Sequence, residues 1–162
     1  MTDKLNQWQS IVDAIVEEDR ILRLRLASCP VALRESRASD ESLSFKETLA
    51  HIAFWDDFTV SFFSRKLDRT SCNPSPPGDF EENSRKALSA AARLPFGEVL
   101  ARYLEATGAL IEFLRVHWDQ LSDRERNDFW VPLKHRRHHR AALFESLDEA
   151  LGSTTQELAA GA

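Results

Sequence analysis

"FGEVLARYLEATGALIEFLRVHWDQL", residues 96–121, has the most regular apolar pattern in the chain. Its apolar residues recur at alternating intervals of four and three, the heptad pattern of helices packed nearly parallel or antiparallel. We therefore predict a long helix over about residues 96–120 that buries one face against other helices. The predicted inward face consists of Leu100, Leu104, Thr107, Ile111, Leu114, Trp118 and Leu121.

Working outward, two earlier segments also have helical periodicity. The first covers about residues 3–27, and its apolar seam is interrupted by Asp19. That carboxylate is either the buried partner of a cation or the mark of a locally open seam. The second segment ends near Lys66 and starts after Ser44, which forms an S-x-x-E capping box with Glu47. Its apolar surface is broad enough to touch two neighbouring helices.

A last long helix is predicted to begin near Lys134, after "WVP", and to fade beyond Gly152. Before residue 96, a loop over residues 68–83 and a short helix over residues 80–92 complete the pattern. No segment shows the alternation of a strand. The predicted fold is all-α: a four-helix bundle with a short extra helix in the long loop between helices two and three.

Composition is typical of one ordinary globular domain spanning residues 1–162, with 43% hydrophobic and 29% charged residues. A net charge of -5 argues against a nucleic-acid partner. Cys29 and Cys72 form neither a secreted disulfide framework nor a C-x-x-C motif. "MTDKLNQWQS" at the start has no apolar signal core, and no 18-residue apolar run occurs. We expect a cytoplasmic protein with free thiols and no membrane partner.

"KHRRHHR", residues 134–140, holds three of the five histidines. His135 and His139 are one helical turn apart on one face, and two such imidazoles can meet a single metal ion. His138 projects about 100° away from His139, so we expect it in solvent. His51, on the broad apolar face of the second helix, is the candidate third ligand. The alternatives stay open: a polar helix face for the pair, and a hydrogen-bonded core histidine for His51.

Arg136 and Arg140 project within the apolar arc of the last helix, where an unpaired cation is unfavourable. At the mouth of a bundle they would hold an anionic substrate or pair with Asp19 or Asp56. The simpler interpretation, which we favour, is a solvated first helical turn.

Three segments together resemble the DinB-like superfamily, which includes the mycothiol-dependent maleylpyruvate isomerase type. They are "SFKETLAHIAFWDDFTVSFF", "NSRKALSAAARLPFGEVLARYLEATGALIEFLRVHWDQLSDRE" and the terminal H-x-x-x-H. The resemblance implies an up-down-down-up four-helix bundle, often a homodimer, that binds a divalent metal near one end. Carried onto this chain, its metal ligands are His51, His135 and His139. The basic segment before the last helix departs from the family pattern, and a shifted register would put His138 in place of His139.

The resemblance also implies a metal-dependent enzyme that acts on a small electrophilic molecule in detoxification or stress response. The reaction would be that of a thiol S-transferase, using mycothiol, bacillithiol or glutathione, or of an isomerase or hydrolase. We expect Zn or Ni, with Fe or Mn as alternatives, because neutral imidazole suits such ions. Asp19 and Asp56 are candidate general bases or partners that orient the ligands.

Two other functions stay open. One is a non-catalytic protein that sequesters a small molecule in the bundle cavity or senses stress. The other is a helical interaction module in which "KHRRHHR" contacts an acidic partner.

Overall fold

The computed structural model describes residues 2–37, 39, 42–68 and 80–160, with side chains described from residue 7 to residue 152 except residue 80. The described residues contain no β-strand, which confirms the all-α prediction. Most of the predicted loop over residues 68–83, including Cys72, lies outside the described residues. The long helices of the protein are α1 (Thr2–Ser28), α2 (Phe45–Leu67), α4 (Phe96–His117) and α6 (Trp130–Ala160). The shorter elements are η1 (Val31–Leu33), α3 (Phe80–Ala92), η2 (Trp118–Gln120) and α5 (Asp123–Asp128).

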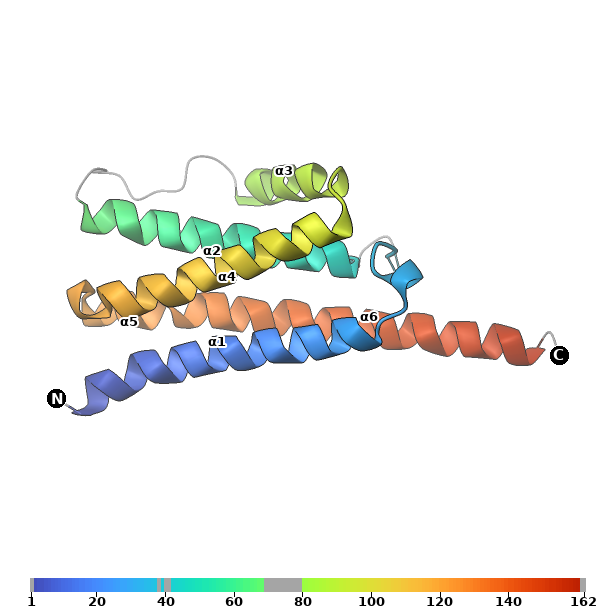
Figure 1. The fold of residues 1–162 in the computed structure, drawn as a ribbon, viewed down its shortest axis with the longest axis horizontal. Helices are drawn as coiled ribbons and strands as arrows, with labels where there is room; N and C mark the ends of the chain where they lie inside the picture. Colours follow the sequence, from blue (N-terminus) through green and yellow to red (C-terminus); the bar gives the residue numbers. More distant parts are fainter. Residues whose placement is uncertain (1, 38, 40–41, 69–79, 161–162) are drawn as a thin grey trace.

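The four long helices lie side by side as a helical bundle (Figure 1). α2 packs against α3, α4 and α6, while α1 packs against α4 and α6. α3 lies along the outer side of α2, and the last turns of α6 extend beyond the other helices. A short helix therefore does lie between the second and third long helices, as the sequence predicts.

The start of α2 follows from its sequence. Ser44 accepts a hydrogen bond from the Glu47 backbone N–H, and the Glu47 side chain accepts one from the Ser44 N–H. This reciprocal capping box satisfies two donors that a helix terminus otherwise leaves unpaired. The predicted N-terminus of α2 is confirmed.

The buried face of α4 agrees with the predicted one only in part. Four of the seven predicted residues are buried: Thr107, Leu114, Trp118 and Leu121. Leu104 of the predicted face is 41% exposed, whereas Tyr103 is fully buried. One residue is about 100° of helix rotation, and α4 has apolar residues at four-three spacing on both arcs. Periodicity alone therefore could not choose between the two faces. The residues of α4 that the structure buries are Val99, Tyr103, Ala106, Thr107, Leu110, Phe113 and Leu114.

The segment before the last long helix was also predicted incorrectly. α6 begins at Trp130 rather than near Lys134, and it continues beyond Gly152. Pro132 lies in its first turn, where a missing N–H breaks no helical hydrogen bond. α5 was not predicted, although Ser122 and Glu125 form a second capping box at its start.

Two clusters of buried apolar residues fill the bundle, and a layer of polar side chains divides them. Each of the four long helices supplies residues to both clusters, on either side of buried polar side chains. We give the name polar layer to one such side chain from each helix: Asp19, Asp56, Thr107 and Arg136.

Within the described residues, no helix is both long enough and apolar enough to cross a bilayer.

Candidate metal centre

The basic run at residues 134–140 separates into three environments because successive residues of a helix project about 100° apart. His135 and His139 are half-buried and face α2. Arg136 is fully buried in the polar layer. Lys134 and His138 are exposed, as we expected for His138. The run is therefore neither a continuous basic patch nor a fully solvated helix start.

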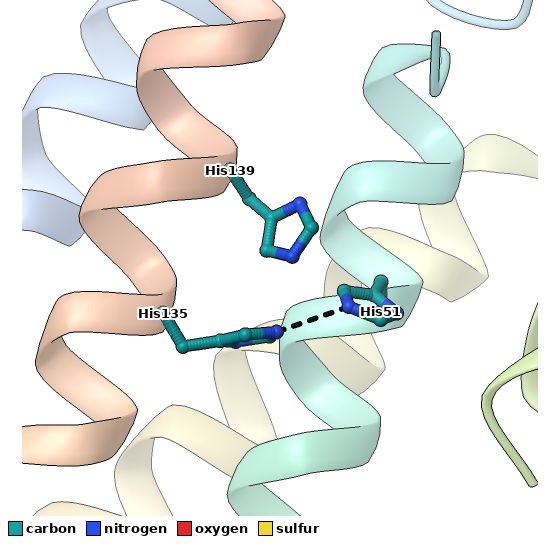
Figure 2. Close-up of side chains that lie close together, drawn as sticks. All are labelled: His51, His135 and His139. Atoms are coloured by element: carbon teal, nitrogen blue, oxygen red, sulfur yellow. Dashed lines mark hydrogen bonds between the residues drawn. The ribbon is translucent and has the colours of Figure 1, made fainter. Parts of the chain in front are cut away.

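His51 of α2 and the two histidines of α6 point toward one another (Figure 2). The Nε2 atoms of His51 and His135 are 3.0 Å apart. The ring centroid of His139 lies 4.4 Å from each of the other two rings. One ligand nitrogen from each imidazole can be chosen so that all three atoms lie within 4.8 Å of one another. The structure thus brings together the three predicted ligands, which we call the histidine triad.

Ser84 of α3 lies behind His51. Its hydroxyl oxygen is 2.8 Å from His51 Nδ1, on the side of the ring opposite the triad. If Nδ1 carries the proton and donates it to Ser84, Nε2 is left with a lone pair directed at His135. Such hydrogen bonds set the tautomer and orientation of metal-binding histidines.

All three imidazoles favour the neutral form. Burial lowers the pKa of His51 below its ordinary value. Burial and the neighbouring histidines lower the pKa of His135 to about 3 and that of His139 to about 4. Near neutral pH the rings are therefore uncharged, which is the form that binds a metal ion.

Two open cavities reach the triad. The larger has a volume of about 390 Å³, and the smaller about 180 Å³. A cavity of the larger size accommodates a small organic molecule. The larger cavity is lined by His51, Trp55, Glu81, Ser84, Arg85 and His135. The smaller one is lined by Ser42, Leu43, Thr48, His138, His139, Ala142, Leu143 and Ser146.

The two candidate carboxylates lie in the polar layer, and their described contacts are not with the histidines. Asp56 is 1% exposed and pairs with Arg136. Burial raises the pKa of the Asp56 carboxyl to about 6 against the effect of Arg136, so the pair is ionised near neutral pH. Asp19 pairs with Arg23 at 2.9 Å, so it is the buried partner of a cation. Neither carboxylate is exposed to a substrate in this conformation.

The two candidate substrate-binding arginines are already paired. Arg136 is 0% exposed, so the interpretation of a solvated first helical turn was wrong for this residue. A substrate cannot reach its guanidinium in this conformation. Arg140 Nε lies 2.5 Å from a carboxylate oxygen of Glu18, and Arg137 Nε lies 3.0 Å from the other. Arg136 thus has one of its two predicted partners, Asp56, whereas Arg140 pairs with Glu18 and not with Asp19 or Asp56.

Sequence reasoning missed Glu18 and Ser84. Glu18 follows Ile15 by three residues and precedes Leu22 by four, so it lies on the apolar face of α1. That position was a usable signal, because a carboxylate there needs a cationic partner. Ser84 gave no such signal, since only the packing of α3 on α2 brings it to His51.

The fold and the site therefore define a helical bundle with a half-buried cluster of three neutral histidines. Comparisons of the chain with family models, with curated proteins and with solved structures found no match.

Proposed function

We propose that this protein binds one divalent transition-metal ion through His51, His135 and His139. The observation that carries the proposal is the convergence of three ligand nitrogens within 4.8 Å, from helices far apart in the sequence. Zinc with Zn–N bonds of about 2.0–2.1 Å in a tetrahedral site separates ligand nitrogens by about 3.3 Å. The Nε2 atoms of His51 and His135, at 3.0 Å, are already close to that separation.

The residues present fit such an ion. The imidazoles are neutral, and Nε2 of His51 is available as a ligand if Nδ1 donates its proton to Ser84. We expect Zn or Ni, with Fe or Mn as alternatives, because three imidazole nitrogens suit borderline ions. Three protein ligands are the set found in catalytic rather than structural zinc sites.

We further propose an enzyme that acts on a small electrophilic molecule, as a thiol S-transferase, isomerase or hydrolase. A metal ion held here would lower the pKa of a thiol or water that coordinates it. The protein itself would supply the cavity of about 390 Å³ beside His51 and His135, with the indole of Trp55 as an apolar wall. Resemblance to DinB-like proteins supports this class, including a role in detoxification or stress response.

A second candidate is a non-catalytic protein that sequesters a small molecule. The observation that favours it is the burial of Asp56 and Arg136, which leaves the larger cavity without those two groups. Trp55, Ser84 and Arg85 would then serve binding only.

The finer architecture also belongs to the proposal. In Figure 1, α1 and α6 run in one direction and α2 and α4 in the other, which supports an up-down-down-up topology. The single domain, the homodimer and the cytoplasmic location stay predictions.

The proposal is tested by elemental analysis of the untagged protein. We expect about one divalent ion per chain in the wild type and its loss in His51→Ala and His139→Ala, because each variant leaves two ligands. His138→Ala is the matched control, since its side chain is exposed beside the triad. It should retain the ion.

Three results would count against this assignment. A wild-type protein that takes up none of Zn, Ni, Fe and Mn would contradict metal binding. Loss of the ion in His138→Ala, with His139→Ala still loaded, would move the site to His138. A loaded protein that protects a small molecule without converting it, after screens with several thiols, would favour the sequestering function.

A further inference from the structure

The polar layer connects the same two helices that carry the histidine triad. Asp56 lies five residues after His51 on α2, and Arg136 directly follows His135 on α6. α2 and α6 run in opposite directions (Figure 1), and the Asp56–Arg136 pair joins them next to the contact between His51 and His135. The spacing of the histidines therefore depends on how these two helices are held together.

Arg136 holds its place through contacts with two other helices. It pairs with Asp56 of α2, and its Nη2 donates a hydrogen bond of 2.8 Å to Thr107 Oγ1 of α4. Its Nη1 donates a hydrogen bond of 3.2 Å to the Tyr103 hydroxyl of the same helix. Arg136 and Tyr103 are both 0% exposed. A planar guanidinium that makes several such bonds fixes direction as well as distance.

Apolar packing does not fix this geometry by itself. α4 has two arcs with apolar four-three spacing, and α2 has a broad apolar surface, so several helix rotations would bury similar areas. Burial of apolar area is non-directional. A buried ion pair is often no more stabilising than apolar residues of similar volume, but in some systems buried polar groups specify register. The position of the polar layer beside the triad agrees with that second role.

We propose that Asp56 and Arg136 are positioning residues: they fix the rotation and register of α6 against α2, so that His135 and His139 face His51. This inference rests on the proposed metal site, and the polar layer would set its geometry. Thr107 and Tyr103 hold Arg136 in the orientation that reaches Asp56.

The test replaces the pair by apolar residues, in the double variant Asp56→Leu/Arg136→Met. We expect it to unfold at a denaturant concentration equal to or above that of the wild type. Its Zn²⁺ affinity, measured by competition with a chromophoric chelator, should fall by roughly tenfold or more. In the metal-free protein, nuclear Overhauser contacts between the His51 and His135 rings should weaken. A merely structural pair would change stability and leave the ring contacts intact.

Arg126→Met is the matched control, because it removes a buried arginine at α5 that donates to the Trp118 carbonyl. It should leave Zn²⁺ affinity unchanged even if stability falls. Tyr103→Phe/Thr107→Val keeps the ion pair with Asp56 and removes the two hydrogen-bond acceptors that α4 offers to Arg136. It should weaken Zn²⁺ binding by a smaller factor than Asp56→Leu/Arg136→Met does. If that apolar double variant does not fold, Tyr103→Phe/Thr107→Val tests the positioning role in its place.

Unchanged Zn²⁺ affinity and intact ring contacts in a folded Asp56→Leu/Arg136→Met protein would overturn the positioning role. The same result in Tyr103→Phe/Thr107→Val would overturn it if the first variant is unfolded. A wild type that binds no Zn²⁺ would instead overturn the metal site, and the ring contacts of the metal-free proteins would still decide the positioning role.

Discussion

His135 and Arg136 are neighbours in sequence, yet their side chains enter different chemical environments. The imidazole of His135 meets His51 at 3.0 Å, while the guanidinium of Arg136 is fully buried against Asp56. The helix rotates by about 100° between them, which is enough to separate a ligand from a structural cation. The chemical character of the run at residues 134–140 is thus decided residue by residue.

Ser84 gives the sharpest prediction at this scale. Ser84→Ala removes the hydroxyl 2.8 Å from His51 Nδ1, so the imidazole loses its hydrogen-bond partner on that nitrogen. We expect Zn²⁺ affinity to fall roughly 10–100-fold. Competition with a chelator measures the affinity, and ¹⁵N NMR of the metal-free protein reports which nitrogen of His51 is protonated.

Two further variants isolate the hydroxyl of Ser84. Ser84→Thr keeps it and should bind Zn²⁺ nearly as well as the wild type. Ser89→Ala makes the same change at an exposed position of α3 and should have no effect. Wild-type affinity and an unchanged tautomer in Ser84→Ala would show that the serine does not orient His51.

Among the elements, α2 has the largest structural role. It packs against α3, α4 and α6 and carries His51, the buried Asp56 and the aromatic side chain of Trp55. Its first residue is fixed by the capping box at Ser44 and Glu47, and Ser44 is 2% exposed. The position of His51 along the bundle depends on this well-defined start.

We predict that Ser44→Ala destabilises the protein by about 1 kcal/mol, because the N-cap hydroxyl no longer accepts the Glu47 N–H. Urea unfolding monitored by circular dichroism measures the free energy of unfolding. Ser61→Ala provides the comparison, since Ser61 is an exposed interior position of the same helix. It should be neutral or slightly stabilising. Equal effects of the two substitutions would mean that the cap contributes nothing.

The elements also show what local signals can predict. Ser44 and Glu47 predicted the start of α2, and the region before Pro95 predicted α3, because caps and breakers act within one turn. The start of α6 was predicted after Pro132, as if this proline ended the preceding segment. In the structure α6 begins at Trp130, and Pro132 is accommodated in its first turn. The buried face of α4 was predicted only in part, because its pattern suits two helix rotations.

At the scale of the whole molecule, the buried ionisable groups make stability depend on pH. The folded pKa values of His135 and His139, about 3 and about 4, lie below the ordinary value of 6.5. Between the folded and the ordinary pKa values, the unfolded chain therefore binds more protons at these two histidines than the folded protein does. Their contribution to the free energy of unfolding is fully present above pH 6.5 and is lost as the pH drops. Asp56 acts in the opposite sense, because burial raises its pKa from 3.8 to about 6.

We predict that the metal-free protein loses stability as the pH falls from 6.5 toward 4. Three imidazoles have lowered pKa values, whereas only two carboxyls, those of Asp56 and Asp57, have raised ones among the described residues. Urea midpoints measured across this range in the presence of a chelator test the prediction. The double variant His135→Gln/His139→Gln should show a weaker dependence. Parallel curves for the two proteins would show that these imidazoles do not cause the pH effect.

The sequence by itself determined the helical class and most helix limits, because periodicity, caps and prolines act over a few residues. It also singled out His51, His135 and His139, since two histidines one turn apart on a helix and a third on an apolar face need no tertiary knowledge to be noticed. Only the tertiary structure decided that these rings lie together, that Ser84 contacts His51, and that Arg136 is buried against Asp56. Those contacts join different helices, and their geometry depends on helix rotation and register, to which a pattern within one helix is insensitive.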